Sequence, residues 1–116
     1  MKVSLLFFLF FFSVSLFCQT SPNPCIQQSV FRVVVIGSST AAGTGASQAD
    51  SAWVNRYRRA LKNINAQNEV INLAQGGYTT YRLMPNNFTS TLNRPAVDTL
   101  KNITAALKLN PSAVIV

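Results

Sequence analysis

A run of apolar residues that stops abruptly at a glycine constrains the fold of this chain more than any other feature. The run covers Val33 to Ile36, and the segment from Gly37 to Gly45 then contains only small residues, three glycines among them. An unbroken apolar run of this kind is typical of a strand buried on both faces in a parallel sheet. In open α/β sheets, the loops that follow the carboxyl ends of the strands hold the ligand sites. A serine on a tight turn at this point is therefore a candidate nucleophile.

Residues 1–18 have the layout of a secretory signal peptide. Lys2 gives a positive start, and Leu5 to Phe17 is almost entirely Leu, Phe and Val, broken only by serines. This run is shorter than the about 20 residues that span a bilayer. We expect cleavage near Cys18 and Gln19, which makes the mature chain secreted or periplasmic, with membrane contact only during export. A lipoprotein signal acylated at Cys18 and an uncleaved anchor are the alternatives.

The mature chain is expected to form part of one α/β domain. Residues 19–29 include Pro22 and Pro24 and are expected to be a linker, and residues 30–116 form the domain. The hydrophobic patterns predict strands at 30–36, 69–73 and 113–116, helices at 52–63 and 95–108, and polar loops at 37–51 and 74–93. This order predicts a doubly wound parallel sheet with right-handed crossovers. Because so few elements bury little surface, we expect the chain to be the amino-terminal portion of a larger domain.

The spacing of apolar residues predicts which helix faces are buried. In the first helix we expect a cap at Asp50 or Ser51 and opposed faces, apolar at Trp53, Tyr57, Ala60 and Leu61 and basic at Arg56, Arg59 and Lys62. In the second helix we expect Pro95 in the first turn, an end at Asn110-Pro111 and a buried stripe of Val97, Leu100, Ile103 and Leu107.

Charge and cysteine content exclude several classes of function. The chain has ten Lys and Arg against three Asp and Glu, with a cluster only at Arg56 to Lys62. We interpret this cluster as a solvated helix face, with an acidic polysaccharide or an anionic surface as the alternative partner. A nucleic-acid footprint would show basic residues interleaved with aromatics on one face, and export argues against such a partner, so no nucleic acid partner is expected. With no histidine and with Cys25 the one mature cysteine, we expect no metal and no organic cofactor. Cys25 would pair outside this stretch or stay a free thiol.

Two polar loops follow neighbouring predicted strands. The first is Gly37 to Thr40, and the second runs from Asn72 to Thr80 with two adjacent glycines. Acyl transfer needs a nucleophilic hydroxyl together with backbone N–H groups close to the developing oxyanion. Glycine lets the backbone approach a substrate and adopt positive φ. One serine of the first loop and one glycine of the second would supply both parts.

At these loops the chain resembles the SGNH (GDSL-type) esterases and lipases, and the resemblance covers residues 32–116. Gly37-Ser38-Ser39-Thr40 is similar to the family's first block, Gly-Asp-Ser-Leu/Thr, which implies that Ser39 is the nucleophile. Ser38 departs from the block, which has Asp there. The segment from Asn72 to Gly77 is similar to the second block and implies that Gly77 belongs to the oxyanion hole. Trp53 stands where family members often carry a tryptophan.

The resemblance implies a flavodoxin-like three-layer sandwich with a parallel sheet, truncated after its third strand. It also implies a serine ester hydrolase that acts on an acyl or acetyl ester of a small molecule or a polysaccharide, and the signal peptide makes this hydrolase an exported one. Asn110-Pro111 and the strand after it are similar to the approach to the third block, Gly-x-Asn-Asp. That block and the Asp-x-x-His of the last block are not among the 116 residues. We therefore expect the chain as given to be inactive.

Other interpretations stay open. Ser39 could be a polar turn residue and Gly77 the hinge of a tight turn, while Ser38, Thr40 and Ser47 are expected to be structural. Asn72 is expected to hold its loop by side-chain to backbone bonds. The segment Tyr78 to Tyr81 would line a groove or pack on the sheet edge.

Two further classes of function compete with the esterase. One is a non-catalytic carbohydrate-binding module on the same fold. The other is a nucleotide- or phosphate-binding domain, against which two features of the sequence argue. No lysine occurs between Lys2 and Lys62, and Gln48 stands where the dinucleotide motif has its third glycine.

Overall fold

The computed structural model describes residues 29–116 of the chain. The predicted signal peptide, Cys25 and nearly all of the predicted linker lie outside the described residues. Within residues 29–116, no helix has both the length and the apolar character needed to cross a membrane.

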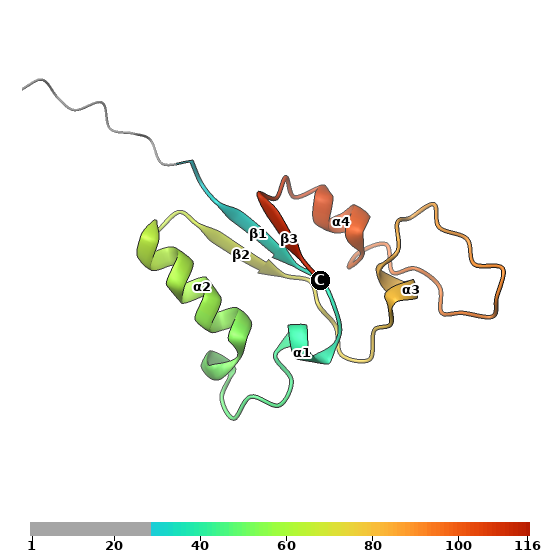
Figure 1. Ribbon diagram of the computed structural model, residues 1–116, viewed down its shortest axis with the longest axis horizontal. Coiled ribbons are helices and arrows are strands. Elements are labelled where there is room, and N and C mark those ends of the chain that lie inside the picture. The colour runs from blue at the N-terminus through green and yellow to red at the C-terminus, as the bar shows by residue number, and fades with distance from the viewer. Residues whose placement is uncertain (1–28) are drawn as a thin grey trace, which may run out of the picture.

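The core is a parallel sheet of three strands in the order β2-β1-β3 (Figure 1). The strands are β1 (Arg32–Val35), β2 (Glu69–Asn72) and β3 (Ala113–Ile115). They are each shorter by one to three residues than the predicted ranges, but their existence and order are confirmed. Both edges of β1 are paired, with Val34 opposite Ile71 on one side and opposite Val114 on the other.

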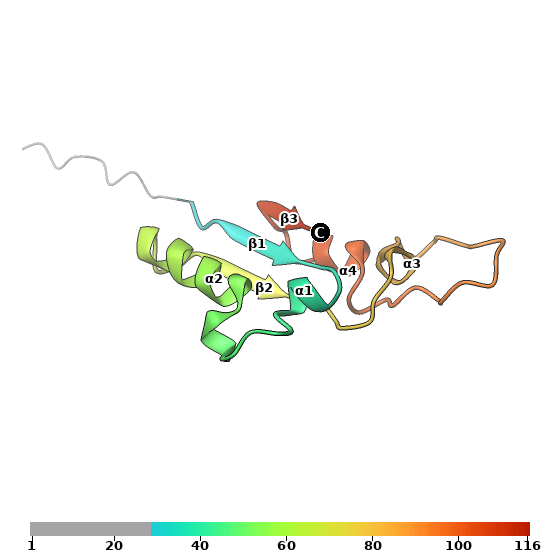
Figure 2. The same cartoon turned by 60° about the horizontal axis from the view of Figure 1, so that its bottom comes forward.

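Helices cover both faces of the sheet, so the molecule is an α/β protein with three layers (Figure 2). The helix α2 (Trp53–Ile64) packs Tyr57 and Leu61 against the face formed by Val33 and Val35. The helix α4 (Ile103–Leu107) packs Ile103 and Ala106 against the opposite face, formed by Val34 and Ile36. Successive side chains of a strand point to opposite faces, which is why the unbroken run in β1 serves both layers.

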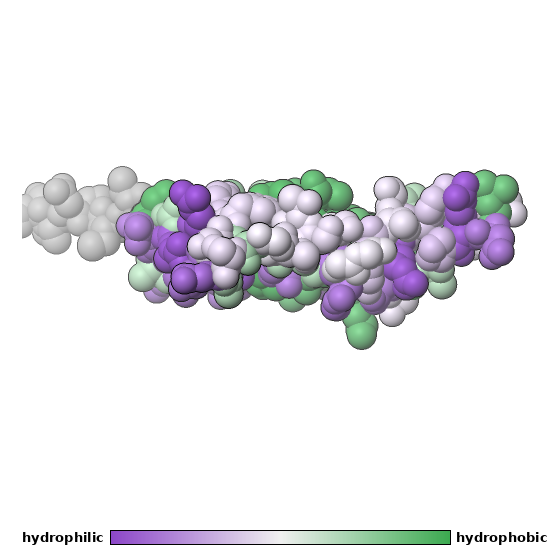
Figure 3. Space-filling model, turned by 90° about the horizontal axis from the view of Figure 1, so that it is seen from below, coloured by the Kyte–Doolittle hydropathy of each residue, from purple (hydrophilic) through white to green (hydrophobic). Residues whose placement is uncertain are grey.

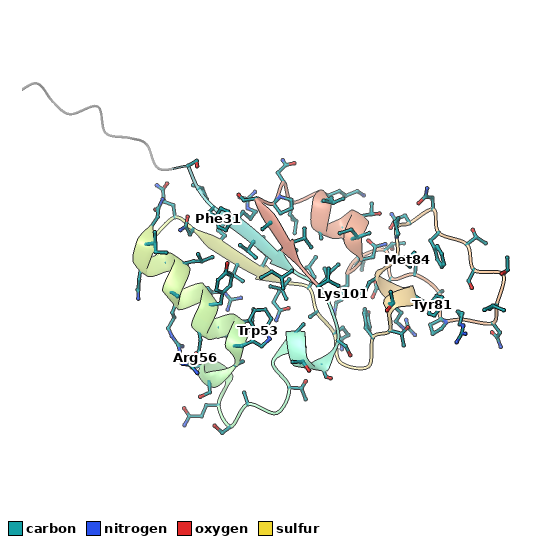
Figure 4. All side chains as sticks on the ribbon, in the orientation of Figure 1. Phe31, Trp53, Arg56, Tyr81, Met84 and Lys101 are labelled. Atoms are coloured by element: carbon teal, nitrogen blue, oxygen red, sulfur yellow. The ribbon has the colours of Figure 1, made fainter. Side chains whose placement is uncertain are left out.

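The predicted faces of α2 need a partial correction. Tyr57 and Leu61 pack on the core as expected, but Val54 is its fully buried residue, whereas Trp53 and Ala60 are exposed. The basic residues Arg56, Arg59 and Lys62 are exposed as predicted, and Figure 4 shows Arg56 pointing away from the sheet.

The predicted cap of α2 is wrong. The residue at the N-cap is Ala52, and no side chain caps the helix. Asp50 and Ser51 lie one turn earlier, in the 3-10 helix η1 (Ala49–Ser51). Ala52 is buried, so the chain enters α2 against the core rather than from solvent.

The second predicted helix is mostly absent: α4 begins at Ile103 rather than at Pro95. The reason is the buried Asn102, whose Oδ1 accepts the Ala105 amide at 2.9 Å and so caps the helix at this point. Upstream, the Asp98 amide donates to the Arg82 carbonyl at 3.0 Å, which holds the chain in an irregular path. Of the predicted stripe, Ile103 packs on the sheet, Val97 is half-buried, and Leu100 and Leu107 are exposed.

Two short helices occur where loops are predicted. They are α1 (Ser39–Ala42), directly after β1, and α3 (Thr80–Leu83), after β2. Between α3 and α4 a long excursion extends away from the sheet in both views (Figures 1 and 2). At its base the rings of Tyr81 and Phe88 lie 6.3 Å apart, and the Arg94 guanidinium lies 5.0 Å from the Tyr81 ring.

The outer edge of β2 is covered by Arg58. The amides of Glu69 and Leu73 donate toward β1, so the Val70 carbonyl between them points away from it. Arg58 donates to this carbonyl twice, from Nε at 3.1 Å and from Nη2 at 3.0 Å. An edge strand that is covered by a charged side chain of a neighbouring helix is hindered from pairing with another chain.

Replacing Arg58 with alanine should uncover the β2 edge. We expect the Arg58→Ala variant to self-associate more readily than the parent and to lose about 1.5–3 kcal/mol of stability, because a charge-assisted hydrogen bond is lost. Light scattering and denaturant unfolding measure the two effects. Arg56→Ala is the matched control, because Arg56 lies on the exposed side of the same helix and no described residue bonds its side chain. Equal behaviour of the two variants would contradict this role of Arg58.

The cap of α4 gives a second prediction. Asn102 also donates from Nδ2 to the Met84 carbonyl at 3.0 Å and to Asn86 Oδ1 at 2.6 Å, so its loss removes three hydrogen bonds at once. We expect Asn102→Ala to lower the free energy of unfolding by about 1–3 kcal/mol, as measured in urea. Asn87→Ala, at an exposed position, should change it by less than about 0.5 kcal/mol. A small effect at residue 102 would rule out the cap as the cause of the late helix start.

Candidate functional site

The two loops singled out in the sequence lie side by side at the carboxyl edge of the sheet. The ladder between β1 and β2 continues past both strands: the Leu73 amide donates to the Val35 carbonyl at 2.8 Å. Two residues further on, the Gln75 amide donates to the Gly37 carbonyl at 3.0 Å. The predicted adjacency of the loops is therefore confirmed, and it results directly from the parallel pairing of β1 and β2.

Ser39 is the first residue of α1 and follows a turn that requires glycine. Gly37 has φ +147°, and a Cβ on it would come within 2.9 Å of the Ala41 Cβ. Ser38 occupies the N-cap but makes no capping bond with its side chain. Ser39 is half-buried, and no group of residues 29–116 forms a hydrogen bond with its hydroxyl. The hydroxyl is thus available at the carboxyl end of the central strand.

Gly77 lies in a tight turn of the second loop. The turn is closed by the Tyr78 amide, which donates to the Gln75 carbonyl at 3.2 Å, and Gly77 has φ +79°. Positive φ at the third residue of a turn is typical of type II and favours glycine. A Cβ at Gly77 would meet nothing within 4 Å. Backbone conformation rather than space thus requires the glycine, and the residue is exposed beside the serine turn.

Asn72 links the two loops with its side chain. Its Nδ2 donates to the Ala41 carbonyl at 3.1 Å, and its Oδ1 accepts the Ala74 amide at 3.0 Å. The expectation that this residue holds its loop by side-chain to backbone bonds is confirmed. The bond to Ala41, which crosses to α1, could not be anticipated from the sequence.

A cavity of about 300 Å³ opens next to the serine turn. It is lined by Gly37, Ser38, Thr40, Ala41, Trp53, Ile115 and Val116. It lies between the ends of β1 and β3. The chain leaves β1 toward β2 on one side and later returns to β3 on the other side of β1, so the direction of the connections reverses at this point. Such reversal points are the usual ligand sites of open α/β sheets. Ser39 is not a lining residue.

Trp53 forms one wall of this cavity. Its Nε1 donates to the Thr40 carbonyl at 2.9 Å, and Figure 4 shows the ring at the start of α2 on the side of α1. About a third of the residue is exposed, at 37%. Sequence reasoning placed Trp53 on the buried face of α2 and missed its contact with α1.

The surface around α1 is only weakly polar. Seen from below, the middle of the molecule is pale between two more hydrophilic ends (Figure 3). Small residues of the segment 37–51, mostly Gly, Ala, Ser and Thr, account for this character. Among residues 29–116, no three His, Cys, Asp or Glu side chains gather into a group suited to a metal ion.

The start of the predicted groove segment, Tyr78 to Tyr81, is tied to the chain before α4. The Tyr78 hydroxyl donates to the Asp98 carboxylate, and the Arg82 guanidinium lies 5.4 Å from the Tyr78 ring. In addition, Lys101 Nζ donates to Gln75 Oε1 at 2.5 Å. The loop that carries Gly77 is thus held from the side of α4 as well as from β1.

The hydrogen bond between Tyr78 and Asp98 shifts both groups. It lowers the pKa of Asp98 below its ordinary value, with the Leu100 amide bond acting in the same direction. The same bond raises the pKa of Tyr78 above its ordinary value, helped by desolvation. Both shifts favour a neutral tyrosine beside an ionised carboxylate.

Comparison of the chain with protein-family models, with curated proteins and with solved structures found no match in any of the three.

The Tyr78–Asp98 bond predicts a window of pH. Because the pKa of Asp98 is lowered, its contribution to stability is present above the ordinary value of 3.8 and is lost as the pH falls through the folded value. Because the pKa of Tyr78 is raised, its contribution is present below 10.0 and is lost as the pH rises through the folded value. The stability difference between the parent and Tyr78→Phe should therefore be largest between these limits, as measured by urea unfolding over a series of pH values.

In a tyrosinate absorbance titration, the component that Tyr78→Phe removes should titrate above 10.0. A removed component at or below that value would contradict the bond.

Proposed function

We propose that the protein is an exported serine ester hydrolase of the SGNH (GDSL-type) kind, in which Ser39 is the nucleophile. The proposal is carried by the hydrogen bond of 3.0 Å between the Gln75 amide and the Gly37 carbonyl, which joins the serine turn to the loop of Gly77. The sheet order β2-β1-β3, with helices on both faces, is compatible with the flavodoxin-like architecture of that family.

The proposed reaction is acyl transfer in two steps. The Ser39 oxygen attacks the ester carbonyl carbon, and the negative charge that develops on the carbonyl oxygen is met by the backbone N–H groups of Ser39 and Gly77. The bond to the leaving alcohol then breaks, which leaves an ester on Ser39. Water attacks that ester, releasing the carboxylic acid and restoring the serine hydroxyl.

The first step needs a base for the serine proton. The 116 residues contain no histidine, and a serine hydroxyl without a base is a weak nucleophile. In the family that the chain resembles, a histidine of the last block is this base, and an aspartate of the same block orients the histidine. The proposal therefore assigns the nucleophile to Ser39 and the two oxyanion donors to the backbone N–H groups of Ser39 and Gly77. It assigns the base to a longer form of the protein.

The proposed substrate is an acyl or acetyl ester of a small molecule or a polysaccharide. The cavity of about 300 Å³ beside the serine turn supports a small acyl group, since it lies at the lower limit of ordinary ligand sites. Its walls include Trp53, Ala41 and Ile115, which suit an apolar group. The Ser38 and Thr40 residues add polar groups at the same cavity.

Ester hydrolysis with a Ser39→Ala control tests the proposal. The 116-residue chain should hydrolyse p-nitrophenyl acetate no faster than its Ser39→Ala variant, because it lacks a base for the serine proton. In a form of the protein that supplies the histidine and aspartate, Ser39→Ala should lower kcat by at least about 10⁴-fold. Ser47→Ala, at an exposed serine of the same loop, should leave kcat unchanged. Turnover that survives Ser39→Ala in that form would refute Ser39 as the nucleophile.

A further inference from the structure

The helix α1, which begins at Ser39, is held by neighbouring elements rather than by its own sequence. It has four residues, none of them buried, and no side-chain cap. A single helical turn is unstable in isolation. Glycine at both ends allows close packing, since a Cβ on Gly43 would lie 2.8 Å from the Ala52 Cβ. The position of α1 therefore depends on bonds that come from outside it.

Two side chains from different elements bond the carbonyl groups of α1. Trp53, at the start of α2, donates from Nε1 to the Thr40 carbonyl at 2.9 Å. Asn72, at the end of β2, donates from Nδ2 to the Ala41 carbonyl at 3.1 Å. Thr40 and Ala41 are the two residues directly after Ser39, so both bonds act within one helical turn of the serine.

The Asn72 amide has only one orientation that satisfies both of its partners. Its oxygen must face the Ala74 amide, which donates at 3.0 Å, and its nitrogen must face the Ala41 carbonyl. The backbone of Asn72 is fixed in turn, because it lies opposite Val35 in the sheet. The side chain is thus a rigid link between the sheet, α1 and the loop of Gly77.

We propose that Asn72 and Trp53 are positioning residues for Ser39, which fix the serine relative to the Gly77 loop by holding the carbonyl groups of α1. This inference rests on the proposed function, in which Ser39 attacks the substrate. A displacement of about 1 Å in a reacting group costs about 100-fold in rate. Asn72 begins the loop that carries Gly77, so one side chain sets the distance between the two parts of the site.

Hydrogen exchange of the Asn72→Asp variant tests the inference. The aspartate still accepts the Ala74 amide but presents a carboxylate oxygen to the Ala41 carbonyl, which removes that bond and makes the two oxygens repel each other. The Ala42 and Thr44 amides, which donate at 2.9 Å to the carbonyls of Ser38 and Ser39, report on α1. They should exchange about tenfold faster, which corresponds to the loss of one hydrogen bond. Asn87→Asp makes the same chemical change at an exposed loop position and should not alter their exchange.

Trp53 supplies a second variant and a spectroscopic signal. Trp53→Phe keeps an aromatic ring but removes the N–H, and it should speed exchange of the same two amides. In Asn72→Asp, acrylamide quenching of Trp53, the chain's single tryptophan, should rise because release of α1 takes the Thr40 carbonyl away from the indole N–H.

Two results would overturn the inference. One is unchanged exchange of the Ala42 and Thr44 amides in both variants. The other is equal acceleration in β1, which would show a general loss of stability rather than release of α1. Neither measurement requires ester hydrolysis, so a failure here is separate from a failure of the Ser39→Ala test.

Discussion

The pairing of β1 on both of its edges is the interaction on which the rest of the structure depends. Val33, Val34 and Val35 are 0% exposed because β2 and β3 flank the strand while α2 and α4 cover its faces. The register opposes Val35 to Asn72 on one side and to Ile115 on the other. Everything that leaves the carboxyl edge is placed by this register: the serine turn, the glycine turn and the walls of the cavity.

The elements that could be predicted are those whose signal is continuous along the chain. The apolar run of β1 and the helical spacing of Tyr57 and Leu61 each report a buried face over a whole element. The stretch from Pro95 to Leu100 carries a similar spacing without forming a helix. There the outcome depends on Asn102 and on the bond from Asp98 to Arg82, whose partners are distant in the sequence. Apolar spacing contains no information about such partners.

The same distinction applies to the candidate site. The adjacency of the loops of Ser39 and Gly77 follows from parallel pairing and could be predicted, as could the kind of bond that Asn72 makes. The contact of Trp53 with Thr40 and that of Tyr78 with Asp98 could not, because each joins groups whose proximity arises only after the layers have packed. These contacts nevertheless hold the two loops of the site.

The central position of β1 also determines the order in which the molecule can assemble. Phe31 bonds to Asn68, 37 residues away, whereas Arg32 bonds to Ser112, 80 residues away. The unit of β1, α2 and β2 is therefore complete long before β3 leaves the ribosome, since synthesis proceeds from the amino terminus. Until then one edge of β1, together with Val34 and Ile36 on the face that α4 will cover, stays open to water and to other chains. Long-range parallel pairing is slow, so this interval is when a nascent chain would most need a chaperone.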